Sequence, residues 1–232
     1  MRAFRREGGD LVAEVDAGER EVLATVVADV AELLGGLPGT RPAGDAGDAG
    51  GDRPRGDALG EVHLRLDPLP APDDPAVHRL LPDASRDDPE VTAEFRRLTE
   101  DDLRARKLRR LQELHTALLG PAPAGGTAVR GGRHRAGAVV RVPRDRAPEL
   151  AATLTDVRLV LGERLGVTDE EASDRLEQEV VHGDPAPGDH AAQARQYLGS
   201  VFLALGWWQE TLMACLLADL PEPPQHDGAG RD

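Results

Sequence analysis

The chain has 232 residues, of which 40% are hydrophobic, and this is enough for one good-sized core. A net charge of −14 disfavours simple electrostatic wrapping of nucleic acid, and the most apolar stretch, 197–208, is shorter than the roughly 20 residues of a membrane span. The charged first residues predict no export signal, and the single cysteine, Cys215, fits a reducing compartment. We therefore expect a single cytoplasmic domain without membrane association.

The N-terminal residues predict a β-hairpin followed by a helix. Two strand-like segments within 3–15 flank a Gly-Gly pair, which favours a tight hairpin turn. Asp16 and Glu19 have the spacing of a capping box, and apolar residues then recur at helical spacing as far as Leu34. A second Gly-Gly pair is expected to end this helix.

Three segments have compositions that cannot build a core. Residues 37–60 form a Gly/Asp/Pro-rich stretch that is predicted to be a disordered insertion, since it has almost nothing to bury. Residues 120–137 are predicted to be a flexible Gly/Arg-rich loop, and 221–232 a disordered tail. The remaining chain is expected to form one domain.

The middle of the chain predicts three helices and a strand. Ala76–Leu81 reads as a short helix stopped by Pro82. Residues 89–98 and 99–119 are expected to be two further helices, because Thr99 and Asp102 stand in capping-box positions. Residues 139–142 predict a short strand that pairs with the hairpin, because an isolated hairpin is marginal in water.

The C-terminal third predicts three more helices. The first carries an apolar stripe from Leu150 to Leu165 and should stop at Gly166, and another helix begins at Thr168. The last, Ala191–Leu217, has apolar residues at alternating steps of four and three and is expected to be the central helix. The predicted fold is mainly α, a helical bundle with a small N-terminal β-hairpin and one further short strand.

Signatures of catalysis and of cofactor binding are missing from the sequence. The serines lack a nucleophile elbow, and the Gly-Gly pairs lack the lysine and hydroxyl of a phosphate loop. His182, Asp184, Asp189 and His190 come nearest to a metal-binding cluster, but a Gly- and Pro-rich loop fixes no tetrahedral geometry. We expect no catalytic residue, cofactor or metal site, and a solvated acidic loop around these four residues.

One part of the acidic chain is basic. From Phe95 to Arg146 there are 13 basic and 5 acidic residues, and Arg104 and Arg110 lie on its predicted helix. Three interpretations remain open: a solvated face paired with this protein's own acidic regions, a surface for an acidic protein, and a nucleic-acid surface. The last lacks stacking aromatics and a binding motif.

Lys107 is the only lysine among the 28 basic residues. An ammonium group differs from the planar guanidinium of arginine, so Lys107 is a candidate for a site that requires an ammonium. The alternative is a lysine that serves only as exposed, solvated charge.

Two blocks of sequence resemble a known family. The first reads DPAVHRLLPDA at 74–84 and EFRRLT at 94–99, and it continues to Lys107. The second reads LTDVRLVLGERLG at 154–166 and is followed by WQETL at 208–212. Together they resemble the actinobacterial domain-of-unknown-function family twenty-seventeen over nearly the whole chain. The chain differs from the family's usual Trp-Leu and Asn-Asp at Glu149-Leu150 and Thr155-Asp156.

This resemblance implies a cytoplasmic protein of unestablished activity. Members are typically encoded beside ClpS, the adaptor of the Clp protease, and near genes of sulfur-carrier cysteine synthesis. That neighbourhood implies an accessory role in regulated proteolysis, with a component of the Clp system as partner.

The second block also contains polar residues among apolar ones: Asp156, Arg158 and Arg164. One interpretation is an ion-pair network that locks helices together, because an unpaired buried charge would cost several kcal/mol. The other is partner recognition or catalysis.

Three functions follow in order of preference. The first is a non-enzymatic interaction or regulatory protein, which an exposed apolar patch around Trp207 would favour. The second is an enzyme, which a buried cleft holding Lys107, Asp156 and Arg158 would favour. The third is a nucleic-acid-associated protein, whose affinity would fall steeply with salt. The sequence does not predict the oligomeric state.

Overall fold

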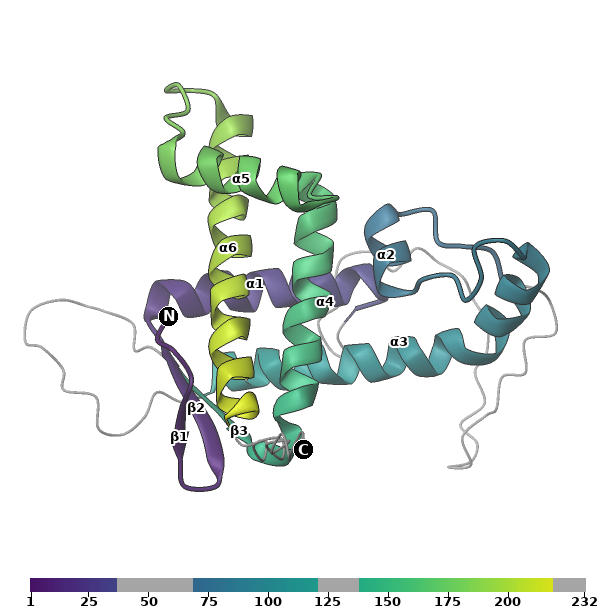
Figure 1. Cartoon of the computed structure of the whole chain (residues 1–232), viewed down its shortest axis with the longest axis horizontal. Coiled ribbons are helices and arrows are strands. Elements are labelled where there is room, and N and C mark those ends of the chain that lie inside the picture. Colours follow the sequence, from purple (N-terminus) through teal and green to yellow (C-terminus); the bar gives the residue numbers. More distant parts are fainter. Residues whose placement is uncertain (37–68, 121–137, 219–232) are drawn as a thin grey trace, which may run out of the picture.

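The computed structural model describes residues 1–36, 69–120 and 138–218 (Figure 1). In chain order its elements are β1 (Arg5–Glu7), β2 (Asp10–Val15), α1 (Ala17–Leu33), α2 (Pro75–Leu80), α3 (Pro89–Leu119), β3 (Ala138–Pro143), a short 3-10 turn (Arg144–Arg146), α4 (Ala147–Leu165), α5 (Glu170–His182) and α6 (His190–Leu217). The predicted mainly α fold with an N-terminal hairpin and one further strand is confirmed. The segments predicted to be disordered or flexible, 37–60, 120–137 and 221–232, lie outside the described residues except for Gly120.

The three strands form one antiparallel sheet in the order β1-β2-β3. Gly8 adopts φ 64° at the hairpin turn, a conformation that glycine reaches without steric cost. Strand β3 pairs with β2 so that Leu11 lies opposite Val142 and Val15 opposite Ala138. The predicted pairing of the strand at 139–142 with the hairpin is therefore confirmed.

Two helix ends form as local sequence predicts. The Asp16 side chain accepts from the Glu19 backbone N–H at 2.9 Å, and the Glu19 carboxylate accepts from the Asp16 N–H at 2.8 Å, which completes the capping box of α1. Helix α4 ends at Gly166, whose φ of 70° lets the Val167 N–H donate to the Gly162 carbonyl.

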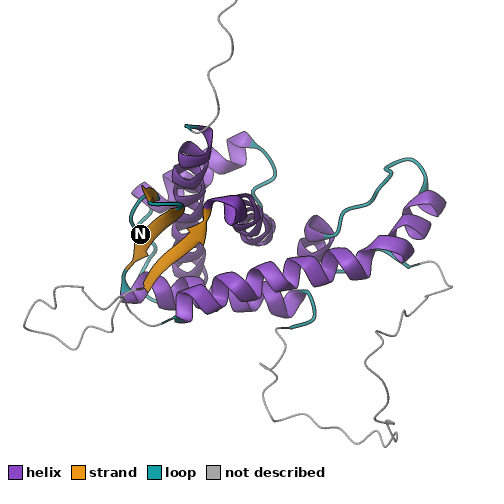
Figure 2. Cartoon of the chain, turned by 90° about the horizontal axis from the view of Figure 1, so that it is seen from below, coloured by secondary structure: helices purple, strands orange, loops and turns teal. Residues whose placement is uncertain are grey.

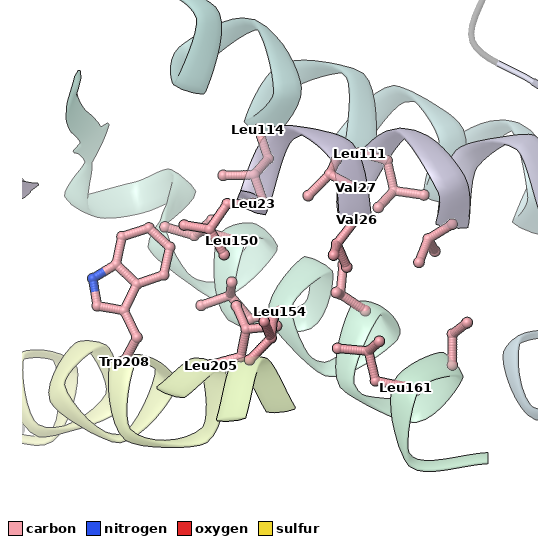
Figure 3. Packing of buried hydrophobic residues seen from close by; sticks show 14 of the residues in the cluster. Leu23, Val26, Val27, Leu111, Leu114, Leu150, Leu154, Leu161, Leu205 and Trp208 are labelled. Atoms are coloured by element: carbon pink, nitrogen blue, oxygen red, sulfur yellow. The ribbon is translucent and has the colours of Figure 1, made fainter. Parts of the chain in front are cut away.

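Two pairs of helices cross each other in the body of the molecule. Helices α4 and α6 run antiparallel and are joined by α5, and they cross the α1–α3 pair (Figure 1). The core lies where these pairs meet (Figure 3). Its labelled side chains come from all four helices: Leu23, Val26, Val27, Leu111, Leu114, Leu150, Leu154, Leu161, Leu205 and Trp208.

Helix α4, rather than α6, is the central helix. It packs against α1, α2, α3, α6 and β3, and eleven of its 19 residues are buried. Only seven of the 28 residues of α6 are buried. The expectation that the last helix is central was wrong.

Residues 89–119 form one continuous helix rather than two. The Thr99 hydroxyl donates to the Phe95 carbonyl one turn earlier at 2.8 Å, so Thr99 lies inside the helix instead of capping a new one. No glycine or proline interrupts the chain between Pro89 and Leu119. The predicted break at 98–99 was therefore wrong.

Candidate functional site

The candidate residues lie on three helices. Lys107, Arg104 and Arg110 are on α3, Asp156, Arg158 and Arg164 are on α4, and Trp207 is on α6. The structure brings some of them together and separates others.

Lys107, Arg110 and Asp156 form a buried cluster between α3 and α4. The Lys107 Nζ lies 2.5 Å from Asp156 Oδ1, and the Arg110 Nη2 lies 3.2 Å from Asp156 Oδ2. Lys107 and Asp156 are both buried. Each carboxylate oxygen of Asp156 is thus engaged by a cation of α3. The cluster therefore links α3 to α4 through ion pairs.

Arg158 does not join this cluster. Residues two apart on an α-helix point about 200° away from each other, so Asp156 faces α3 while Arg158 faces α6. The Arg158 guanidinium lies 5.2 Å from the centre of the Phe202 ring and donates to Gln209 Oε1 at 3.0 Å. A methyl group at Gly206 would lie 3.4 Å from Arg158 Nη2, so this glycine leaves room for the guanidinium. Arg158 therefore connects α4 with α6.

Arg164 belongs to the solvent-exposed junction of α4 with α2. It lies 2.5 Å from Asp74, which also caps α2 by accepting from the Ala76 N–H at 2.8 Å. The hydrogen bond from Arg164, followed by that from Ala76, lowers the pKa of Asp74 below its usual range. Arg164 therefore pairs with Asp74 of the α2 cap and takes no part in the Lys107 cluster.

A second buried polar network was not predicted from the sequence. Arg96 donates to Asp83 at 2.6 Å and to Glu100 at 2.8 Å, and Glu100 accepts from Arg104 at 2.6 Å. Arg96 and Glu100 are only 5% and 6% exposed. Arg104 also donates to the Leu34 carbonyl at the end of α1. The spacing of four residues along α3 was the signal available in the sequence.

Ion pairs determine the protonation of this network. Burial raises the pKa of Glu100, but the hydrogen bonds from Arg96 and Arg104 outweigh it and hold the pKa below its usual range. The hydrogen bond from Arg96, with a smaller one from His78, likewise lowers the pKa of Asp83. Carboxyl groups of this kind stabilise the fold above their unfolded-state pKa and lose that contribution as the pH falls through the folded value.

We expect Glu100→Gln to lower the free energy of unfolding at pH 7 by about 3 kcal/mol, because Arg96 and Arg104 lose a buried counter-charge. The deficit should shrink as the pH falls from the usual pKa of a glutamate through the lower folded-state pKa of Glu100, where Glu100 of the unsubstituted protein also becomes neutral. Urea unfolding at a series of pH values measures both effects. The exposed Glu94, which pairs with Arg97, provides the control: Glu94→Gln should change little. A deficit for Glu100→Gln that stays constant with pH would contradict the assignment.

A groove of about 180 Å³ lies beside the Lys107 cluster, between α3, β3 and α4. Its charged side chains are already paired within the fold: Arg146 with Glu113 at 2.7 Å and Glu149 at 2.5 Å, and Arg110 with Asp156. The groove therefore combines paired charges with an apolar lining that includes Leu114, Val140 and Leu150. The His182–His190 loop lies within the described residues, and in these parts of the chain no three potential metal-ligating side chains converge.

Exposed apolar side chains gather on two helical faces. On α6 the outer face carries Trp207, which is 44% exposed, and Met213 and Leu217 are exposed further round the same helix. Near the start of α3, Val91, Phe95 and Leu98 are 53%, 52% and 60% exposed. The α6 face includes the predicted Trp207, whereas the α3 face was missed because its apolar spacing is that of an ordinary core-facing helix.

The fold and these sites define a mainly α protein with a three-stranded antiparallel sheet, buried ion-pair networks and two exposed apolar helix faces. The family model of the domain of unknown function DUF2017 matches residues 1–216, and the chain belongs to this family. A search of the curated proteins and a search of the solved structures find no match.

Proposed function

We propose that this protein is a non-enzymatic interaction or regulatory protein of the cytoplasm, and that the outer face of α6 around Trp207 binds its partner. The observation that carries the proposal is a large aromatic side chain left 44% exposed on a long apolar helix. Contiguous exposed apolar surface marks interaction sites, and tryptophan is prominent among the residues that dominate binding energy.

The composition of α6 supports a protein partner. Between Tyr197 and Leu217 the only charged residue is Glu210, in a chain where 30% of residues are charged. By length and composition alone α6 could cross a membrane, since an 18-residue window has a mean hydropathy of 1.3. In the fold, 33% of that window is buried. A core helix of a folded domain passes the same test, and α6 packs on α4, α5 and β1.

A component of the Clp system is the partner that we propose to test first. Its support is the gene neighbourhood with the adaptor ClpS that the family resemblance implies, together with the family membership of residues 1–216. This support is indirect, so the experiment has to connect the partner to the α6 face.

The experiment is a pull-down from a native-host lysate with the unsubstituted protein, Trp207→Asp and a control. The control is Val181→Asp, because Val181 is 62% exposed on α5. We expect Trp207→Asp to weaken capture of a Clp component by about 2 kcal/mol or more, roughly 30-fold, while the control retains it. Equal capture by all three proteins would count against the α6 face. Binding of lipid vesicles that depends on Trp207 would point to a membrane instead.

The enzyme and nucleic-acid alternatives have weaker support. The pairing of Lys107 with Asp156 favours a structural role, because both carboxylate oxygens hold cations. Several exposed arginines of the basic segment are paired with acidic residues, such as Arg146 with Glu113 and Arg141 with Glu7. Such pairing fits a solvated face better than a phosphate-binding surface.

A further inference from the structure

The first turns of α3 have the reverse of the usual amphipathic arrangement. A surface helix normally buries its apolar stripe and exposes its charges. Here Arg96 and Glu100 are 5% and 6% exposed, whereas Val91, Phe95 and Leu98 are 53%, 52% and 60% exposed. We call these three residues the α3 stripe. Their spacing of four and three residues places them on one face of the helix.

The buried charges hold this face outward. Arg96 is fixed by Asp83 and Glu100, which lie at 2.6 and 2.8 Å. Turning the helix to bury the α3 stripe would keep the Arg96–Glu100 pair, which lies within α3, but it would break the Arg96–Asp83 pair and bring the buried Arg96 and Glu100 to the surface. The orientation of the α3 stripe is therefore a property of the fold.

The helix start is also rigidly placed. Asp88 caps it by accepting from the Glu90 and Val91 N–H groups at 3.0 Å. The Thr92 hydroxyl, in the first turn of α3, donates to the carbonyl of Ser85 in the preceding loop at 2.9 Å. A surface that is ordered before binding loses little conformational entropy when a partner docks.

Acidic side chains lie along one side and at both ends of the α3 stripe. Glu90, Glu94 and Asp101 follow one side of it, and Asp102 continues its line, all of them exposed. Asp87 and Asp88 lie beside its first turn and are exposed too. Arg97 is half-buried and pairs with Glu94 at 2.6 Å. The α3 stripe is thus an apolar strip with an acidic border on one side and at both ends.

We propose that the α3 stripe docks a basic amphipathic helix of a partner protein. Leucine-like side chains of such a helix would cover Val91, Phe95 and Leu98, and its lysines or arginines would face the acidic border. The same border repels the phosphates of nucleic acids and anionic lipids. It also opposes a second copy of this chain, because two acidic borders would then lie against each other.

This surface goes beyond the proposed α6 site. The start of α3 and the outer face of α6 lie in different parts of the molecule, and α3 extends away from the sheet and the α4–α6 pair (Figures 1 and 2). The two faces also differ in chemistry, since the α6 face is nearly free of charge. Two such faces allow the chain to bridge two partners.

The probe is a fluorescently labelled synthetic helix of about five turns, with leucines on one face and lysines elsewhere. A shuffled peptide of the same composition spreads its leucines around the helix. The test variant is Phe95→Glu, and the control is Val181→Glu on α5, also an exposed apolar residue. Both substitutions add one negative charge. Attraction by charge alone therefore predicts equal or tighter binding to both variants.

We expect the amphipathic peptide to bind the unsubstituted protein and Val181→Glu equally, and Phe95→Glu at least about tenfold more weakly. The shuffled peptide should bind all three proteins weakly. Thermal unfolding of each variant checks folding, and Leu98→Ser provides a second, uncharged variant that should weaken binding as well.

Equal binding of the shuffled peptide, or undiminished binding to Phe95→Glu and Leu98→Ser, would overturn the proposal. So would a dimer that Phe95→Glu dissociates, because the occupant would then be a second copy. Trp207→Asp should leave peptide binding unchanged, and this separates the proposal from that for α6. Peptide binding that is weakened by Trp207→Asp but not by Phe95→Glu would also overturn the proposal.

Discussion

Asp156→Asn is expected to lower the free energy of unfolding by about 3–5 kcal/mol. The substitution removes the only negative charge of the buried Lys107–Arg110–Asp156 cluster and leaves two cations facing a neutral amide. Single domains are stable by only about 5–15 kcal/mol, so much of the stability would be lost. Urea unfolding followed by circular dichroism measures the effect.

Arg164→Ala is the matched control for Asp156→Asn, since it also breaks an ion pair of α4. The Arg164–Asp74 pair is exposed to solvent, and exposed pairs typically contribute little to stability. Equal losses for the two variants would mean that the buried cluster contributes no more than a surface pair. Lys107→Met with Asp156→Leu should recover part of the loss, because it removes both a buried charge and its counter-charge.

Trp208→Ala is expected to be similarly severe, at about 3–5 kcal/mol. Trp208 is fully buried and stacks on Phe4, with ring centres 4.9 Å apart. Phe4 is further held by α6, because its N–H donates to the Thr211 hydroxyl at 3.2 Å. The variant should therefore also loosen the N-terminal hairpin, and hydrogen exchange of the β2 amides would show this.

The adjacent Trp207 offers a control of the same residue type. Trp207→Ala should change stability by no more than about 0.5 kcal/mol, because this side chain faces outward. It should leave the exchange of the β2 amides unchanged. A large loss for Trp207→Ala, or faster β2 exchange in it, would show that the outer face of α6 is packed against the fold.

Features governed by neighbours in sequence were predictable. The hairpin turn at Gly8, the capping box at Asp16 and the stop at Gly166 each depend on a few adjacent residues, and all three form. The pairing of β3 with the hairpin was also predicted, because an unsupported hairpin is marginal in water.

The face that each helix buries was harder to predict. Val91, Phe95 and Leu98 have the spacing of a core-facing stripe, yet the fold buries Arg96 instead. Its partner Asp83 lies before the helix, and periodicity within the helix carries no information about it. Helix periodicity alone indicates that Asp156 and Arg158 point to opposite sides of α4. Which residues of α3 and α6 they meet there is set by tertiary packing, which the sequence pattern does not contain.

The position of β2 has a consequence for the order of folding. Strand β2 obtains one partner from β1 beside it in sequence, and the other from β3, which lies more than a hundred residues later. The Phe4 side chain before β1 packs on Trp208, later still. Contacts so distant in sequence close slowly, since loop-closure entropy is lost before they form. The N-terminal hairpin is thus among the last segments to gain its stabilising contacts, and exchange protection of its amides should follow that of α3 and α4.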